Sequence, residues 1–151
     1  IKTYPEARLC MVGPDKDGSM EEFRKYVNTL GIENQVKITG LLKKEEWIKL
    51  SENYDFFINT TNVDNTPVSV IEAMALGICV LSTNPGGIPF IIQDKSNGIL
   101  IEPGDFSNMA GGLHNLVGNP ELYKKLVMQG RSSAEKYSWE SVKSLWLDLL
   151  S

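Results

Sequence analysis

The stretch Asp64–Gly77, which reads DNTPVSVIEAMALG, decides the fold of this chain. It joins Asp55–Thr61, an apolar run typical of a buried strand, to Pro67–Leu76, which is typical of a helix. Two acids, Asp64 and Glu72, stand on either side of the expected helix start. Because α/β proteins bind anionic ligands where a strand leads into a helix N-terminus, the stretch predicts both an α/β fold and a ligand site.

Strand-like and helix-like segments alternate on both sides of this stretch. Strands are expected at Leu9–Gly13, Val36–Thr39, Asp55–Thr61, Ile78–Thr83 and Gly98–Glu102. Helices are expected at Ser19–Leu30 with Ser19 as its cap, Lys43–Asn53, Pro67–Leu76 and Ile88–Gln93, and then from Asp105, Asn119-Pro120 and Ser138 onward. The strands are apolar without alternation, which indicates a parallel sheet covered on both faces. We therefore predict a doubly wound α/β domain that takes in residues 1–151.

Two features of the C-terminal helices are notable. The last helix places Trp139, Val142, Trp146 and Leu149 on one stripe, so we expect it to pack against another element. Gly111-Gly112 weaken the helix that begins at Asp105, and the sequence gives no reason for them.

The composition is that of an ordinary globular protein, with 42% hydrophobic and 23% charged residues. The net charge of −4 does not favour binding to nucleic acid or to an anionic membrane. No apolar run approaches the ~18 residues of a membrane span, and the first residues lack a signal-peptide core, so a cytoplasmic protein is expected. Cys10 and Cys79 lie in strand-like runs and are interpreted as reduced core residues; with a single histidine, they predict no metal site.

Other motifs are weaker than they look. Asp15–Ser19 resembles a calcium loop, but its required glycine would fall at Met20, so a solvated turn is the better interpretation. Gly13 lacks the partner glycines of a dinucleotide fingerprint. His114 has no acid or nucleophile near it in sequence, and no serine-nucleophile motif is present.

The physical case for a site rests on the Asp64–Glu72 unit. Glu72 lies among small and apolar residues, where a partly buried carboxylate is costly without donors or ligand hydroxyls. The N–H groups of Val68 and Ser69 fall in the first helical turn, free to bind an anion such as a diphosphate. Gly86-Gly87 follow the next strand and allow close backbone approach. The alternative is a helix-end charge at Asp64 and an incidental surface Glu72.

Together these residues resemble the donor-binding domain of retaining glycosyltransferases with two Rossmann-like domains (GT-B), in glycosyltransferase family 4, often called glycosyl transferases group 1. That family carries an acidic pair with seven residues between, then A-M-A-x-G, a strand and a G-G turn. The match here consists of Asp64, Glu72–Gly77, Ile78–Thr83 and Gly86-Gly87. Weaker matches extend it in order along nearly the whole chain: Pro5-x-Ala7-x-Leu9, Val12-Gly13, Val36–Gly40, Asn97–Ile101 and Ser138-Trp139-Glu140.

The resemblance implies a nucleotide diphosphate sugar as donor, transfer with retention, and no metal or other cofactor. Glu72 would hold the ribose hydroxyls, Asp64 would act on the donor sugar as the catalytic-site acid, and the amides of Val68 and Ser69 would bind the diphosphate. The remaining donor-binding residues it implies are Thr66, Gly86 and Gly87. Thr39, Gly40, Leu41 and Leu42, which follow the second strand, would line the base pocket. Positive donors and the helix dipole would stabilise the leaving diphosphate. Such enzymes make polysaccharides and glycoconjugates.

Two positions depart from the family pattern. Asp64 replaces the usual glutamate and is one methylene shorter. Pro67 stands where relatives often have glycine, and it removes one N–H from the anion site. Because of these two positions, the choice of donor is expected to differ from that of relatives.

Relatives begin this domain with a strand and a helix that carry an Arg and a Lys for the diphosphate, and they have an amino-terminal acceptor domain. The chain starts after these parts, so we expect a fragment that transfers no sugar alone. Any association with a membrane surface is expected only through the absent domain. In the usual strand order 3-2-1-4-5-6 the missing strand is central, which predicts a gap in the sheet or a repacked sheet.

Two alternatives stay open at this point. A sugar-nucleotide epimerase of the same architecture would carry further catalytic acids and a histidine near the site. A non-catalytic α/β interaction domain would need neither donor nor acceptor. Titration with UDP-, GDP- and ADP-sugars separates the transferase from the interaction domain.

Overall fold

The structure is a computed structural model that describes residues 3–150. Contacts divide the chain into two compact units, residues 1–49 and 50–151, and each is described by itself. Every strand pair in the described part of the chain is parallel, which confirms the predicted α/β class. The prediction of one domain over residues 1–151 stays a prediction.

The first unit is a β-α-β arrangement. Strand β1 (Leu9–Val12) pairs with β2 (Val36–Gly40), and helix α1 (Ser19–Leu30) and the 3₁₀ turn η1 (Glu33–Gln35) connect them. Helix α2 (Lys44–Ser51) leads from this unit into the second.

The start of α1 differs from the prediction by one residue. The N-cap is Gly18, in a left-handed conformation with φ 81°, and Ser19 is the first helical residue. The Asp15 and Asp17 carboxylates accept hydrogen bonds from the N–H groups of Gly18 (2.9 Å) and Ser19 (3.1 Å). The carboxylates of Asp15 and Asp17 therefore serve as acceptors for the N–H groups at the helix start, and the prediction of Ser19 as the cap was wrong.

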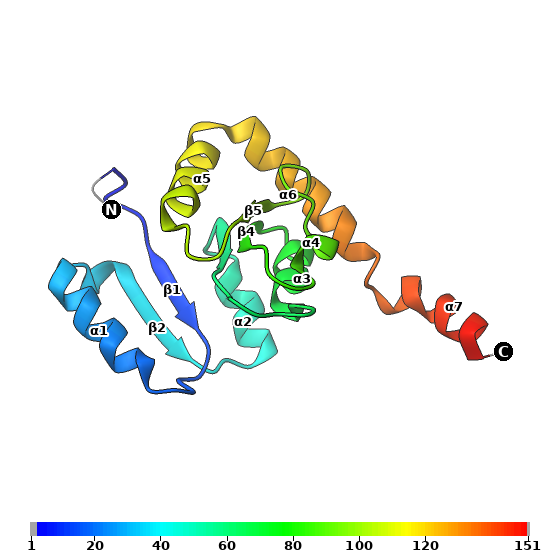
Figure 1. Ribbon diagram of the computed structural model, residues 1–151, viewed down its shortest axis with the longest axis horizontal. Helices are drawn as coiled ribbons and strands as arrows, with labels where there is room; N and C mark the ends of the chain where they lie inside the picture. Colours follow the sequence, from blue (N-terminus) through cyan, green and yellow to red (C-terminus); the bar gives the residue numbers. More distant parts are fainter. Residues whose placement is uncertain (1–2, 151) are drawn as a thin grey trace. The chain divides into compact units, whose positions relative to one another are not determined.

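The second unit is built on a three-stranded sheet in the order β3-β4-β5. The strands are β3 (Phe56–Asn59), β4 (Cys79–Thr83) and β5 (Ile99–Ile101). The helices of this unit are α3 (Val68–Ala75), α4 (Ile88–Ile91), α5 (Phe106–Gly118), α6 (Pro120–Glu135) and α7 (Trp139–Leu150). Helices α3 and α6 pack against each other and against β4, and α5 packs against β4 and β5 (Figure 1).

The core of the second unit surrounds β4, which is buried along its whole length. One cluster consists of Cys79, Leu81, Ile99, Ile101, Leu116 and Leu126 and joins the sheet to α5 and α6. Burial raises the pKa of the Cys79 thiol to about 11, so this cysteine is a protonated core residue at neutral pH. Both cysteines are free thiols, as predicted.

The glycine pair in α5 has a partial explanation. A Cβ atom on Gly112 would lie 3.2 Å from Leu81 Cδ2, so a glycine here lets the helix backbone approach the sheet closely. Gly111 has nothing within 4 Å of such an atom, and nothing in the structure explains it.

The described strands form two separate sheets, β1-β2 and β3-β4-β5. Within the second sheet, β3 ends at Asn59, two residues before the predicted end. Thr61 belongs to the loop that follows, where its hydroxyl donates to the Val63 carbonyl (3.0 Å).

Helix α7 does not behave as its apolar stripe predicts. Among the described residues 3–150 it packs no side chain into a core, and Trp139, Trp146 and Leu149 are each more than half exposed. In Figure 1 the helix extends beyond α6, away from the sheet of its own unit. The element against which the stripe was expected to pack is therefore not found within the described part of this unit. No helix within residues 3–150 is both long and apolar enough to cross a membrane.

The N-cap of α6 provides a test of the local sequence signals. Asn119 accepts a hydrogen bond from the Leu122 N–H (3.1 Å), with Pro120 at the first helical position, as the sequence predicts. Asn119→Ala should lower the free energy of unfolding by about 1 kcal/mol, because this N–H loses its acceptor. Urea unfolding followed by circular dichroism measures the loss. Asn119→Asp keeps an acceptor and should unfold like the wild type; equal losses in both variants would contradict the capping role.

Candidate functional site

Helix α3 separates a buried face from an open one. Its buried face is formed by Val70, Ala73 and Met74, none more than 1% exposed. Val68 and Ser69 are exposed, and Glu72 is half-buried. Glu72 follows Val68 by four residues and Ser69 by three, so all three lie along one face of the helix. The expected partial burial of Glu72 is confirmed. Because helical side chains lean toward the helix N-terminus, the Glu72 side chain is expected to lie over the turn that holds Val68 and Ser69.

The N-terminus of α3 is open at the same face. Pro67 is the N-cap, with φ −71° and ψ 97°, and not the first helical residue as predicted, because its extended ψ lies outside the helical range. Its carbonyl accepts from the N–H groups of Val70 (3.0 Å) and Ile71 (3.3 Å). The N–H groups of Val68 and Ser69 precede these first helical donors, at the positive end of the helix dipole. Such a helix start suits an anion.

Asp64 belongs to the loop between β3 and α3 and is half-buried. Its carbonyl oxygen accepts a hydrogen bond from the Gly87 N–H (3.0 Å). The two glycines that were predicted to bind donor, Gly86 and Gly87, therefore lie in contact with the backbone of the Asp64 loop. Thr66, also predicted to bind donor, is exposed in the same loop. Asp64, Thr66, Gly86 and Gly87 thus come together next to the start of α3.

The predicted base-pocket residues lie in the first unit. Gly40 ends β2 with φ 70°, and its carbonyl accepts from the Gly13 N–H (2.9 Å). Leu41 is 79% exposed and Leu42 is half-buried. Their role in binding a base stays a prediction.

Sequence reasoning missed a polar network at the carboxyl ends of β3 and β4. The Asn59 side-chain amide donates to Ser82 Oγ (3.0 Å), and the Ser82 hydroxyl donates to the Thr83 carbonyl (2.8 Å). The Thr83 hydroxyl donates to the Thr61 carbonyl (2.6 Å). Ser82 and Thr83 are buried. The available signal was polar residues at the ends of two apolar strands, where neighbouring parallel strands place them side by side.

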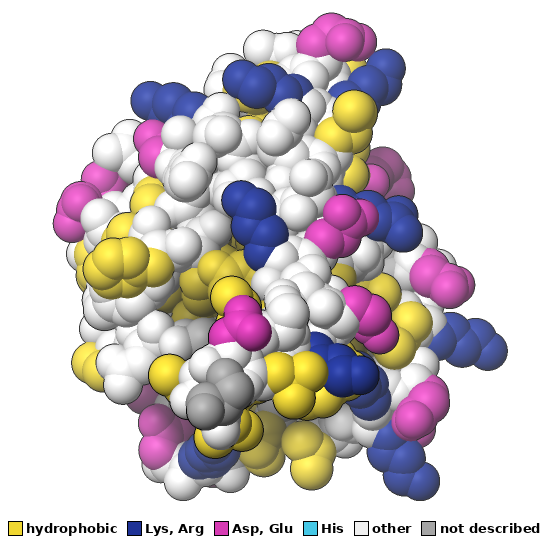
Figure 2. Space-filling model, turned by 90° about the vertical axis from the view of Figure 1, so that its right-hand side faces the viewer, with side chains coloured by type: hydrophobic (Ala, Val, Ile, Leu, Met, Phe, Trp, Pro, Cys, Tyr) yellow, Lys and Arg dark blue, Asp and Glu magenta, His cyan; other side chains and the backbone are white. Residues whose placement is uncertain are grey.

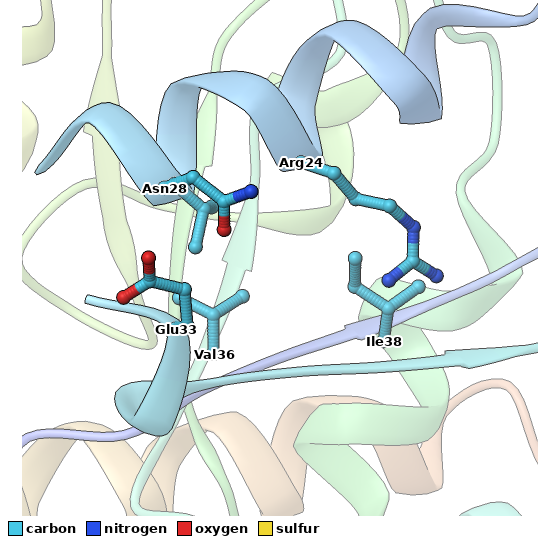
Figure 3. Close-up of a pocket in the computed structure, with 6 residues that line it drawn as sticks. Arg24, Asn28, Glu33, Val36 and Ile38 are labelled. Carbon is cyan, nitrogen blue, oxygen red and sulfur yellow. The ribbon is translucent and has the colours of Figure 1, made fainter. Parts of the chain in front are cut away.

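A cavity in the first unit is a poor candidate for the site. It has a volume of about 170 Å³ and is lined by Arg24, Val27, Asn28, Glu33, Val36 and Ile38 (Figure 3). Ligand pockets usually start at about 300 Å³. None of the residues predicted to bind donor lines it.

The charged side chains on the face seen in Figure 2, and the metal-ligating residues within residues 3–150, indicate no competing site. In Figure 2 acidic and basic side chains alternate over the face shown, with hydrophobic side chains between them. Within residues 3–150, no three His, Cys, Asp or Glu side chains come together as a metal site requires. The prediction that no metal is needed stays a prediction.

Comparison with known proteins decides the family. The family model for glycosyl transferases group 1 matches residues 1–133, and so covers both α3 and the Asp64 loop. The chain belongs to the glycosyl transferases group 1 family. Among curated relatives, an uncharacterized glycosyltransferase of Haemophilus influenzae is 28% identical over 150 residues, which cover 99% of this chain and 41% of the relative.

Solved structures share the fold of this chain. Anabaena HepE superposes with a TM-score of 0.88 at 19% identity in its complex with UDP, and with 0.85 at 20% identity in its complex with UDP-glucose. Each comparison covers 97% of this chain and 41% of HepE. The C-terminal domain of a group 1 protein of Francisella tularensis gives 0.81 at 24% identity, over 89% of this chain and 71% of that domain. These likenesses establish the fold, a Rossmann-like half of a GT-B glycosyltransferase. The group 1 chain spans about two fifths of the Haemophilus relative and of HepE.

Proposed function

We propose that this group 1 chain is the nucleotide-sugar donor-binding domain of a retaining glycosyltransferase. The observation that carries the proposal is the open face of α3, where Glu72 lies one turn behind the exposed start at Val68 and Ser69. One end of this face suits a diphosphate, and the carboxylate suits vicinal hydroxyls. The named relatives are glycosyltransferases, and HepE binds UDP and UDP-glucose, which supports this function and leaves the epimerase alternative without support.

Different residues of the site bind different parts of the donor. Glu72 accepts hydrogen bonds from the ribose hydroxyls, and the amides of Val68 and Ser69 donate to the diphosphate. Asp64 faces the donor sugar from the loop, with Thr66 beside it. When the bond between sugar and diphosphate breaks, the amides and the helix dipole stabilise the charge that develops on the leaving group. This arrangement requires no metal, and an acceptor-binding domain supplies the second substrate.

Donor binding can be tested on the chain by nitrogen-15 NMR. We expect at least one of UDP-glucose, GDP-glucose and ADP-glucose to shift the amide signals of Val68, Ser69 and Glu72, and the shifts to survive EDTA because no metal is involved. If none of these nucleotides moves the α3 signals, the proposal is wrong and the non-catalytic interaction domain is favoured. Shifts that vanish with EDTA would refute the metal-free part.

A further inference from the structure

The backbone of the Asp64 loop lies against the Gly86-Gly87 turn more closely than any side chain would allow. A Cβ atom on Gly86 would lie 2.0 Å from the Asp64 carbonyl oxygen, and one on Gly87 would lie 1.7 Å from the Asn65 carbonyl oxygen. Both separations are far below van der Waals contact. The neighbouring atoms are backbone and cannot rotate away, so a larger residue at either position must displace the loop.

The Gly86-Gly87 turn is anchored in the core by buried residues of the helix that follows it. Gly87 is the N-cap of α4, whose first residue, Ile88, is 0% exposed, and Ile92 just after the helix is also fully buried. Since these side chains anchor the turn in the core, the turn cannot easily retreat from an added methyl group. The Asp64 loop is therefore the part that would move.

A second contact holds the beginning of the same loop. The Thr83 hydroxyl, in a side chain only 4% exposed, donates to the Thr61 carbonyl (2.6 Å). The loop is thus held at Thr61 by β4 and at Asp64 by the turn that follows β4. Both contacts come from the same short segment, residues 83–87.

We propose that Thr83, Gly86 and Gly87 are positioning residues that set where the Asp64 carboxylate stands relative to Glu72. The inference rests on the proposed function, in which Asp64 faces the donor sugar while Glu72 and the α3 amides hold the nucleotide. Displacing the loop then affects the sugar end of the donor and spares the nucleotide end. Gly86 and Gly87 act through Asp64, and a contact of their own with the donor is not required.

Gly87→Ala tests the inference without backbone strain, because Gly87 has an ordinary φ of −89°. The matched control is Gly111→Ala, in the same unit, where an added Cβ meets nothing within 4 Å. Each variant is titrated with the glucose nucleotide that the wild type binds best and with the matching nucleoside diphosphate. We expect Gly87→Ala to lose affinity for the sugar nucleotide and to keep affinity for the diphosphate, and Gly111→Ala to change neither.

A second pair covers the case in which Gly87→Ala fails to fold. Thr83→Val keeps the shape and removes the hydroxyl, whereas Thr83→Ser keeps the hydroxyl. Thr83→Val should show the same selective loss, and Thr83→Ser should bind like the wild type. Equal loss of both nucleotides, or loss of neither, in Gly87→Ala and Thr83→Val overturns the inference.

A ligand-free measurement separates this inference from the proposed function. The amide signals of Asp64, Asn65 and Thr66 should move in Gly87→Ala and stay in place in Gly111→Ala. If the wild type binds no nucleotide, the proposed function fails, and these spectra still decide whether the turn positions the loop. Unmoved loop signals in Gly87→Ala overturn the positioning role on their own.

Discussion

Glu72→Ala should remove most donor binding and leave the fold intact. Hydrogen bonds to a charged group contribute about 1.5–3 kcal/mol, so losing the carboxylate should weaken binding by about 10- to 100-fold. The fold should survive because Glu72 lies on the open face of α3 and alanine is the strongest helix former. Calorimetric titration gives the affinity, and circular dichroism during heating gives the stability.

The matched control is Glu135→Ala, which removes an exposed glutamate at the end of α6 in the same unit. It should bind donor like the wild type. Glu72→Gln keeps one acceptor oxygen without the charge and should lie between Glu72→Ala and the wild type. A folded Glu72→Ala protein with wild-type affinity would show that Glu72 does not hold the ribose.

Local signals in the sequence predicted most of the fold. Asp105 and Asn119 cap α5 and α6 through their side chains, and Gly31 ends α1 in a left-handed conformation with φ 64°. These signals act over three or four residues, so the sequence carries them in full. The candidate site could be proposed from the sequence for the same reason, because the loop and the helix that would form it are adjacent in the chain.

Contacts between distant segments were harder to predict. Glycine at positions 86 and 87 indicated close backbone approach, but the sequence does not say to what, and the partner is the Asp64 loop. The bond between Thr83 and Thr61 spans 22 residues and depends on the pairing of β3 with β4. No packing partner for the α7 stripe is found in the described part of its own unit, because an apolar stripe indicates that a partner is needed without saying where it lies.

Asn97→Ala should be among the most destabilising polar substitutions in the second unit. Asn97 is 5% exposed, and its side chain makes three hydrogen bonds. Oδ1 accepts from the Gln93 N–H (2.7 Å), and Nδ2 donates to the Ile91 carbonyl (3.1 Å) and to Ser133 Oγ (3.0 Å). At about 1 kcal/mol each, the loss is about 3 kcal/mol, a large part of the 5–15 kcal/mol that stabilises a typical domain. Urea unfolding measures it.

Ser133→Ala is the control, because it removes one of the three partners and should cost about 1 kcal/mol. If Asn97→Ala costs no more than Ser133→Ala, the bonds to Gln93 and Ile91 contribute nothing net.

The hydrogen bonds of Asn97 matter for the site as well as for stability. Ile91 is the last residue of α4, the helix that follows the Gly86-Gly87 turn, so Asn97 ties that helix to α6. In Asn97→Ala the helix α4 loses this hydrogen bond, and the Gly86-Gly87 turn that precedes it is held less firmly. Sugar-nucleotide affinity should therefore fall together with stability.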